Sequence, residues 1–340
     1  MLRLPAFHLH EPRSLEEALD LLREHESRAL LIAGGTDLLP NMKHRLFEPE
    51  VLISLARIES LRGIREEPDG GLVIGAMTPL ALIAEHALVR ARAPALGQAA
   101  SVVSGPQLRT MGTLGGNVML DTRCQWYNQS YFWRSALGFC LKKDGSLCHV
   151  IAGGQKCVAA ASNDTAPALM TLRAELGFAS PRGRREIAVD DLWRADGIYN
   201  KTSAPDEILI SVRIPRQSGT HRGAYGKLRE RASIDFPLLG VAARVDLAGD
   251  GSIADADLAL VALAARPLRV KGAALDLVGL APGSSRFPAA LAALAERAHK
   301  QCHSLANIPG DHEYRQAMIP VYVRRTVLAA LDGSGPVHAV

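Results

Sequence analysis

The chain has 340 residues, 48% of them hydrophobic, which is enough for two or three globular domains with substantial cores. Its formal net charge of +4 comes from 39 basic and 35 acidic residues spread along the sequence without a basic run, which argues against nucleic-acid binding. The N-terminus lacks the apolar core of a signal peptide, and no apolar stretch has the length of a membrane span. We therefore expect a cytoplasmic protein.

The first predicted elements are a helix and a strand that ends in a glycine turn. Ser14 and Glu17 have the spacing of a capping box, and leucines at helical periodicity follow, which predicts a helix over residues 15–25. The apolar run in "RALLIAGGTDLLP" predicts a buried strand that ends at Gly34 and Gly35. Such a turn brings backbone N–H groups to the surface.

The next segments continue this mixture of strands and helices. "GLVIGAMTPLALIAEH" predicts a strand, a turn and a helix, with Thr78 as the N-cap and Pro79 at the first helical position. "TLGGNVML" supplies a second glycine turn. "DTAPALMTLRAELGFAS" predicts a short helix and a strand, and "DEILISVRIP" predicts a strand that ends at Pro215.

The last third of the chain has a different composition. Strand-like runs joined by a turn at Asp250 and Gly251 precede two alanine-rich helical stretches. Pro320 lies within the second stretch and should kink that helix or mark a boundary. We expect an α+β N-terminal domain over residues 1–217 and a smaller α+β C-terminal domain over residues 218–340.

The two glycine turns, "AGGTD" at 33–37 and "TLGGN" at 113–117, together predict a site for a nucleotide-like anion. Either turn alone could simply be a tight turn. Glycines let the backbone approach a ligand, and Thr36, Thr113 and Asn117 add short donors suited to phosphate oxygens. Neither turn contains GxxxxGK[ST] or GxGxxG, which disfavours Walker-type and Rossmann sites.

A cysteine-rich insert at about residues 120–160 follows the second glycine turn. It holds four of the five cysteines, separated by 16, 8 and 9 positions: Cys124, Cys140, Cys148 and Cys157. This spacing is unlike the CxxC pairs of zinc ribbons or compact ferredoxin runs. In a reducing compartment, clustered cysteines are more often metal ligands than disulfides. A zinc ion and a four-iron, four-sulfur cluster would both accept four thiolates, so both stay open.

The fifth cysteine, Cys302, lies near His299 and His303. The two histidines could share a helix face, but a metal site there is the weaker hypothesis, because the insert already accounts for the redox residues. No Ser/His/Asp order or paired carboxylate motif stands out, so we expect substrate chemistry to reside on another chain.

Six motifs in order resemble those of one family: "LIAGGTDLLP", "GAMTPL", "TLGGNV", "SNDTAPALMTL", "EILISVRIP" and "YGKLRERASIDFPLLGVAAR". They are similar to the FAD-binding medium subunits of the molybdenum hydroxylase family, which includes xanthine dehydrogenases and carbon monoxide dehydrogenase. The resemblance runs over nearly the whole chain. It implies an FAD-binding domain of the vanillyl-alcohol-oxidase type, with two α+β subdomains, and a C-terminal domain that closes over the FAD.

The resemblance also implies roles for individual residues. The two glycine turns would wrap the FAD pyrophosphate, and Asp164 would bind the adenosine end. Leu209 and Lys227 match positions that line the flavin, where a cation could stabilise an anionic reduced ring. The alternative for Lys227 is a solvated surface lysine. The expected cofactor-binding residues are Leu31, Ile32, Ala33, Gly34, Gly35, Thr36, Asp37, Leu38, Val103, Thr113, Leu114, Gly115, Gly116, Asn117, Asp164, Leu209 and Lys227.

The insert resembles one branch of this family. Most members run directly from the "GGN" turn to the next motif, whereas Asn117 and Asp164 here lie some 45 positions apart. The longer connection is similar to that of the 4-hydroxybenzoyl-CoA reductase type, which implies one four-iron, four-sulfur cluster on the four insert cysteines. The aromatic run "WYNQSYFW" would shield this cluster from water.

The implied function is electron transfer within a larger enzyme, with no catalytic residue on this chain. The implied partners are a molybdopterin-binding large subunit, a small subunit with two two-iron clusters and an external donor such as ferredoxin, in a dimer of heterotrimers. The enzyme would reductively dehydroxylate an aromatic CoA thioester. The alternatives are the same subunit in an enzyme that oxidises another substrate, a stand-alone flavoprotein with structural zinc, and a flavin-binding scaffold or sensor.

Overall fold

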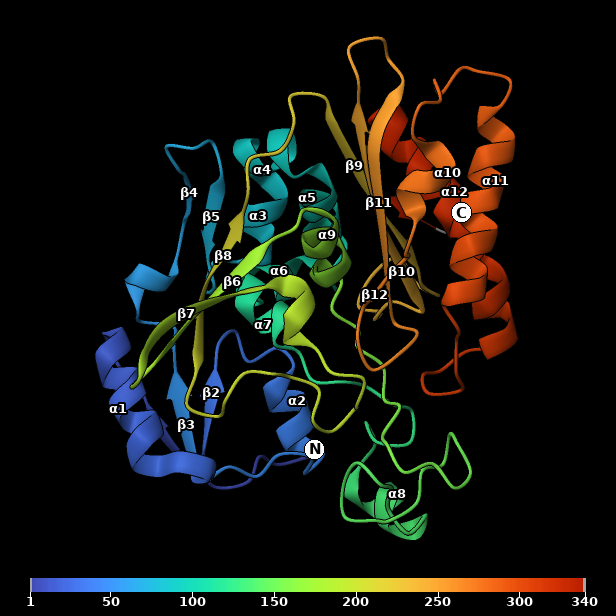
Figure 1. Cartoon of the computed structure of the whole chain (residues 1–340). Coiled ribbons are helices and arrows are strands. Elements are labelled where there is room, and N and C mark those ends of the chain that lie inside the picture. The colour runs from blue at the N-terminus through green and yellow to red at the C-terminus, as the bar shows by residue number, and fades with distance from the viewer. Residues whose placement is uncertain (1, 339–340) are drawn as a thin grey trace.

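The structure is a computed structural model that describes residues 2–338. Its three sheets belong to two N-terminal subdomains and one C-terminal domain (Figure 1). This arrangement agrees with the expected α+β architecture. In the part described, every helix is too short or too polar to traverse a lipid bilayer.

The first subdomain is a parallel three-stranded sheet in the order β1-β3-β2. The capping box is present, because the Glu17 N–H donates to Ser14 Oγ at 3.1 Å, and α1 buries Leu15 against the sheet. The predicted strand β2 is only half-buried beyond Ala29, since it forms an edge of the sheet. The elements are β1 (His8–His10), α1 (Leu15–His25), β2 (Ala29–Ile32), α2 (Leu38–Lys43) and β3 (Val51–Ser54).

The second subdomain is an antiparallel five-stranded sheet in the order β4-β5-β8-β6-β7, with helices on one face (Figure 1). Its strands are β4 (Ile64–Glu66), β5 (Leu72–Gly75), β6 (Glu175–Ser180), β7 (Gly183–Ala188) and β8 (Ile208–Ile214). Its helices are α3 (Leu80–Glu85), α4 (Ala87–Arg92), α5 (Pro94–Ser101), α6 (Pro106–Met111), α7 (Leu114–Val118) and α9 (Thr165–Thr171). The predicted end of β8 before Pro215 is confirmed.

The start of α3 differs from the prediction by one residue. Pro79 occupies the N-cap position with extended backbone, and α3 begins at Leu80. The Thr78 hydroxyl does not cap this helix. It donates instead to the Gly63 carbonyl at 3.1 Å and accepts from the Gly63 N–H at 3.0 Å, so it ties the turn to the neighbouring loop.

The C-terminal domain is a five-stranded sheet in the order β12-β11-β10-β9-β13. The predicted turn between β10 and β11 is confirmed, with Gly251 at a φ of 81°. Pro320 was expected to kink the helix or mark a boundary, and of these two the boundary is wrong, because one continuous helix contains Pro320. The elements are β9 (His221–Leu228), β10 (Leu239–Leu247), β11 (Ile253–Val261), β12 (Leu268–Arg269), α10 (Ala273–Leu277), α11 (Phe287–Gln301), α12 (His312–Asp332) and β13 (Val337–His338).

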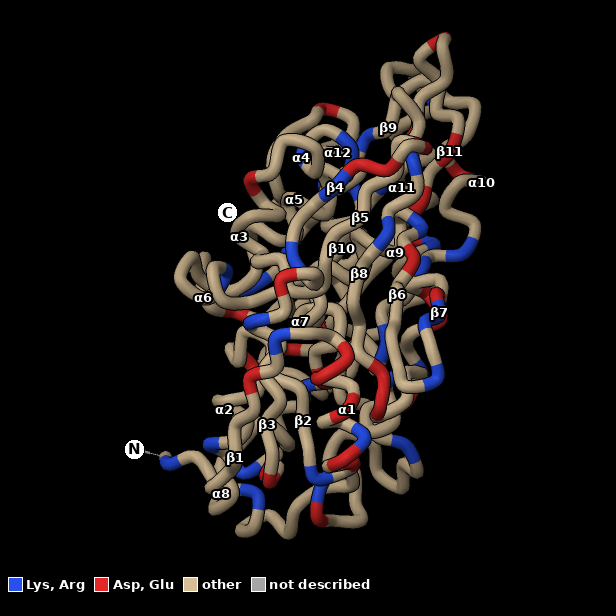
Figure 2. The backbone as a smooth tube through the Cα atoms, turned by 90° about the vertical axis from the view of Figure 1, so that its left-hand side faces the viewer, with Lys and Arg blue, Asp and Glu red and all other residues tan. Residues whose placement is uncertain are grey.

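The domains stack in layers. The sheet of the second subdomain is followed by α3, α5 and α9, then by the C-terminal sheet, and finally by α11 and α12 on the outer face (Figure 1). Figure 2 shows basic and acidic segments interspersed over the surface. An example is Arg213, whose guanidinium pairs with Glu67, Asp69 and Glu175 across the second sheet. The cysteine insert at about residues 120–160 lies at one end of this stack (Figure 1).

Candidate functional site

The two glycine loops lie against each other. The first joins β2 to α2, and the second joins α6 to α7. A Cβ atom at Gly34 would lie 1.9 Å from the Met111 carbonyl oxygen, so this glycine permits the direct contact between the loops. Gly35 has a φ of 69°, in the left-handed region that glycine favours. The sequence prediction that both turns belong to one place in the fold is therefore consistent with the structure.

The first loop has a row of free backbone donors. The N–H groups of residues 34–38 donate to no acceptor within residues 2–338. Consecutive unpaired N–H groups in a turn form a concavity suited to an anion. The Thr36 hydroxyl is half-buried beside them. These groups fit the pyrophosphate of FAD, which needs several donors and little side-chain bulk.

The second loop contributes packing rather than donors. The N–H groups of residues 114–117 are all bonded within the protein, and Gly116 donates to the Thr113 hydroxyl at 3.1 Å. A Cβ atom at Gly115 would lie 2.8 Å from Ala76 Cβ, so this glycine lets α7 pack closely. Gly116 is different, because a Cβ atom there would meet only Thr113 Oγ1 at 3.1 Å and Ala33 Cβ at 3.8 Å.

Asn117 joins α7 to the start of α9 through hydrogen bonds. Its side-chain oxygen accepts from the Thr165 N–H at 3.1 Å and from the Thr165 hydroxyl at 2.6 Å. Its backbone carbonyl accepts from Asn163 at 2.7 Å. The two short polar side chains expected to bind phosphate in the second loop are therefore already bonded within the protein, Thr113 to α7 and Asn117 to α9.

Asp164 and Lys227 form a buried ion pair across the boundary between the domains. Lys227 Nζ lies 3.0 Å from Asp164 Oδ2, and Lys227 also donates to the Val102 carbonyl at 3.0 Å. The Tyr225 hydroxyl donates to the other carboxylate oxygen at 2.8 Å. Burial raises the pKa of Asp164, and Lys227 opposes that rise.

One expectation about this pair is wrong. Lys227 is 0% exposed, which excludes the alternative of a solvated surface lysine. The expected contacts of Asp164 with the adenosine end and of Lys227 with the flavin end stay predictions, and the structure brings the two side chains into contact with each other. Their mutual bond joins the N-terminal domain to β9 of the C-terminal domain.

The remaining expected flavin contacts lie within or beside the core. Leu209 is buried in the hydrophobic core of the second subdomain, where it pairs with Phe178 across two strands. Val103 is half-buried, and its carbonyl accepts from Arg109 at 2.9 Å. The structure accounts for Leu209 by packing, and it leaves Val103 close to the second loop's preceding helix, α6.

The insert is tied to the first glycine loop at its neck. Arg123 and Ala160 exchange backbone hydrogen bonds of 2.8 and 2.7 Å, which closes the neck. The Arg123 guanidinium pairs with Asp37 at 2.8 Å. Burial raises the pKa of Asp37, and the charge of Arg123 opposes that rise. The insert then packs on the segment after α2, where Leu46 joins its core.

The four insert cysteines converge. A single small cavity is lined by Cys124, Cys140, Cys148 and Cys157, together with Trp126, Tyr127 and Lys142. Cys302 is not among them, because it lies in the core of the C-terminal domain. The predicted grouping of four cysteines out of five is thus present in the fold, although wide sequence spacing separates them.

Burial disfavours the thiolate form of two of these cysteines. Burial raises the pKa of Cys124 to about 12 and also raises that of Cys157. Lys142 and the Ala159 N–H, 3.4 Å from Cys157 Sγ, act in the opposite direction. A metal centre would supply the missing charge and deprotonate its thiol ligands.

The cavity offers four thiols to a metal centre. Within the described residues, no three His, Cys, Asp or Glu side chains are close enough together to hold one ion. Tetrahedral zinc at about 2.3 Å from each sulfur requires sulfurs about 3.8 Å apart, and a four-iron cluster also takes four thiolates, one at each corner.

The aromatic run of the insert only partly shields the cavity. Trp126 and Tyr127 line it. Tyr131, Phe132 and Trp133 point to the surface and are 47%, 82% and 37% exposed. The expectation that the whole run shields the cysteines is therefore wrong, because α8 (Tyr131–Ala136) turns these three rings outward.

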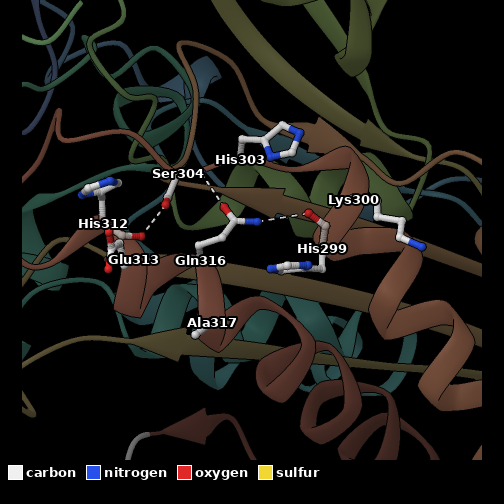
Figure 3. Close-up of a pocket in the computed structure, with 8 residues that line it drawn as sticks. All are labelled: His299, Lys300, His303, Ser304, His312, Glu313, Gln316 and Ala317. Carbon is white, nitrogen blue, oxygen red and sulfur yellow. Dashed lines mark hydrogen bonds between the residues drawn. The ribbon is translucent and has the colours of Figure 1, made fainter.

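The histidines near Cys302 line a separate surface hollow of about 620 Å³ (Figure 3). His299 and His303 cannot share a helix face, because α11 ends at Gln301. Gln316 bridges the hollow by donating to the His299 carbonyl and accepting from the Ser304 N–H (Figure 3). Among residues 2–338, no three metal-binding side chains converge on one ion, in this hollow or elsewhere.

Comparison with known proteins extends over both domains. Residues 5–217 match the family described as the FAD binding domain in molybdopterin dehydrogenase, and residues 224–330 match the CO dehydrogenase flavoprotein C-terminal domain. The chain is 31% identical to the carbon monoxide dehydrogenase medium chain of Hydrogenophaga pseudoflava, covering 96% of this chain and 97% of that one. It is 30% identical to the nicotine 6-hydroxylase medium subunit of Paenarthrobacter nicotinovorans, covering 97% and 99%.

A solved structure of carbon monoxide dehydrogenase from Hydrogenophaga pseudoflava aligns with this chain at a TM-score of 0.79 and 30% identity, covering 98% of this chain and 100% of that chain. The expected two-domain architecture, with an FAD-binding domain and a C-terminal domain, is confirmed by this match. The resemblance inferred from the six sequence motifs is confirmed as well.

Substitution of Gly116 tests the site between the loops. Gly116→Val should leave the protein folded, because its first side-chain atom meets only two side chains, but it should weaken FAD binding at least tenfold, or about 1.4 kcal/mol. The measurement is FAD titration by fluorescence. Gly219→Val is the matched control, since nothing lies within 4 Å of a Cβ atom there. Equal FAD affinity in both variants would remove Gly116 from the site.

Loss of one partner tests the buried ion pair. Lys227→Met should leave Asp164 buried and unpaired, which destabilises the protein by about 3–5 kcal/mol in urea unfolding. The double variant Asp164→Asn/Lys227→Met should recover at least half of that loss, because it buries no unpaired charge. A Lys227→Met protein with unchanged stability but little FAD would instead assign Lys227 to the cofactor.

Proposed function

Because this chain belongs to the family of FAD-binding medium subunits of molybdopterin-dependent dehydrogenases, we propose that it relays electrons between an external protein and the partner subunits of such an enzyme. The observation that carries this proposal is the cavity lined by four cysteines, whose insert is fastened to the first glycine loop by the pair of Arg123 and Asp37. Two redox sites on one chain, joined in this way, suit electron relay.

The first site is for FAD. The free N–H groups of residues 34–38 would hold its pyrophosphate, and Gly116 would leave room beside it. The buried pair of Asp164 and Lys227 would keep the C-terminal domain closed against the N-terminal domain. These residues bind and position the cofactor.

The second site is for one four-iron, four-sulfur cluster held by Cys124, Cys140, Cys148 and Cys157. FAD and iron–sulfur clusters together supply one-electron and two-electron transfer, which protein side chains alone do not provide. Trp126 and Tyr127 would exclude water from the cavity, and Lys142 would contribute positive charge beside it. No side chain of this chain is assigned a catalytic step on substrate.

The partners in this proposal are a molybdopterin-binding large subunit and a small subunit with two two-iron clusters, in a dimer of heterotrimers. Relatives named as medium chains or medium subunits support an assembly of this kind. The external donor would be a protein such as ferredoxin. The insert supports reductive dehydroxylation of an aromatic CoA thioester, as in enzymes of the 4-hydroxybenzoyl-CoA reductase type.

A second candidate is the same subunit in an enzyme that oxidises its substrate. The similarity to medium chains of carbon monoxide dehydrogenase and nicotine 6-hydroxylase favours it. The two candidate functions differ in the direction of net electron flow between this subunit and the molybdenum centre. Structural zinc is not favoured, since no three donors in residues 2–338 converge on one ion.

The test is anaerobic purification of the untagged enzyme from its native cells. We expect three subunit types by mass spectrometry, with FAD, iron and molybdenum bound, and reduction of aromatic CoA thioesters by a low-potential donor. Oxidation of a heterocycle or another substrate in the same screen would select the second candidate. A competent enzyme that elutes with this chain alone would overturn the subunit assignment.

Cysteine replacement tests the metal centre. Cys140→Ser should abolish the iron content, the visible absorption and the reduced-state EPR signal of the cluster, while FAD stays bound because the first glycine loop is unchanged. Cys302→Ser is the matched control and should keep its iron, since Cys302 lies in the other domain's core. Anaerobically prepared protein with stoichiometric zinc and no iron would refute the assignment.

A further inference from the structure

Helix α8 of the insert buries its charged side chain and exposes its aromatic ones, the reverse of an ordinary surface helix. It buries its only charged residue, Arg134, which is 1% exposed. It exposes Tyr131, Phe132 and Trp133, and Leu137 just beyond it is 42% exposed. A helix on the surface of a globular protein normally turns its apolar side chains inward. These four residues are called the α8 face below.

Contacts of Arg134 fix this orientation. Its guanidinium donates to the Arg45 carbonyl at 3.2 Å, at the end of α2, and pairs with Asp144 at 3.3 Å. The helix is therefore fastened to the protein through its polar residue. Its aromatic side chains are held toward the outside, at the end of the molecule where α8 extends beyond the three sheets (Figure 1).

Basic side chains lie beside the α8 face. Most charges of the insert itself are paired or buried, among them Arg123 with Asp37 and Lys142 with Asp121, so the unpaired charge beside this face comes from the end of α2 and the segment after it. Lys43 and Arg45 are exposed and form no ion pair within residues 2–338, and the Arg45 guanidinium lies 6.0 Å from the Tyr131 ring centroid. Aromatic and arginine side chains are enriched in interfaces, and positive charge around them selects an acidic partner.

The α8 face lies close to the cysteine cavity. The ring centroids of Trp133 and Trp126 are 6.1 Å apart, and Trp126 lines the cavity. The His149 ring, 5.4 Å from Trp126, lines it as well. A protein bound at the α8 face would therefore be separated from the cysteines by little more than one layer of aromatic rings.

We infer that the α8 face, with Lys43 and Arg45 at its edge, is the docking surface for a small acidic protein that carries one electron. This inference rests on the proposed function and names where the external donor binds. A patch of four apolar side chains suits a brief encounter, because electron-transfer complexes have small interfaces. One electron passes per encounter: the carrier is oxidised by one electron, the four-cysteine centre is reduced by one, and no bond or proton is exchanged.

The experiment uses the purified heterotrimer and a chemically reduced acidic ferredoxin as the probe. Phe132→Ser and Arg45→Glu should each raise the ferredoxin concentration for half-maximal reduction about fivefold. Reduction by methyl viologen radical, which needs no docking surface, should stay unchanged. The rate with ferredoxin should fall with rising salt in the wild type and depend less on salt in Arg45→Glu.

Matched controls lie on the C-terminal domain. Leu275→Ser removes an exposed apolar side chain, and Arg286→Glu reverses an exposed charge, both away from the insert. They should leave reduction by ferredoxin unchanged. Iron and FAD contents are measured for the wild type and for every variant, which keeps the test of the proposed function apart from the test of the docking surface. A wild-type enzyme without iron would refute the proposed function, whatever the docking variants show.

Two results would overturn the docking surface. One is unchanged ferredoxin dependence in Phe132→Ser and Arg45→Glu when both retain their iron. The other is loss of a subunit or of the dimer in these variants, seen by size-exclusion chromatography with light scattering, which would assign the α8 face to contact within the assembly.

Discussion

The ion pair between Asp37 and Arg123 joins the parts on which the proposed site depends. Asp37 belongs to the first glycine loop, and Arg123 forms the neck of the cysteine insert. The Arg123 guanidinium also lies 3.8 Å from the ring centroid of Phe236, which comes from the C-terminal domain. The Arg123 and Asp37 side chains are 21% and 27% exposed, so each charge is partly shielded from water and is stabilised by the other. One contact thus fixes the loop, the insert and the neighbouring domain in a single arrangement.

The two glycine loops look alike in sequence but serve different physical purposes. In the first, the five consecutive N–H groups of residues 34–38 form no hydrogen bond to any part of the chain that the structure describes, so this loop has donors for an anion. The second has bonded its N–H groups internally and uses Gly115 to pack α7 against Ala76. A side chain is excluded at Gly34 by the Met111 carbonyl, so the loops also limit each other's movement. In the proposed site, the donors of the first loop would face the pyrophosphate and the second loop would form the opposite wall.

Features set by neighbours in the sequence were predictable, and features set by distant contacts were not. The cap at Ser14 and the turn at Gly251 depend on residues within one turn of the chain, and both predictions are confirmed. The burial of Lys227 depends on Asp164, 63 positions away. The orientation of α8 depends on Arg134 reaching the Arg45 carbonyl, 89 positions away. An aromatic run read alone therefore suggests a core, while its partners in the fold turn it toward the surface.

The insert brings its cysteines together through its own contacts as well as through any metal. The bridge between Arg123 and Ala160 closes the neck, and the Gly197 N–H donates to the Cys157 carbonyl at 2.8 Å. The entropic cost of closing a loop at its base grows only slowly with loop length, so the neck can hold a long insert together. Burial raises the pKa of Cys124 to about 12, so a metal centre bound to these cysteines would have to stabilise their thiolates. Such a centre would act on the charge of the insert more than on its backbone, and replacing one cysteine should therefore empty the cavity without unfolding the glycine loops.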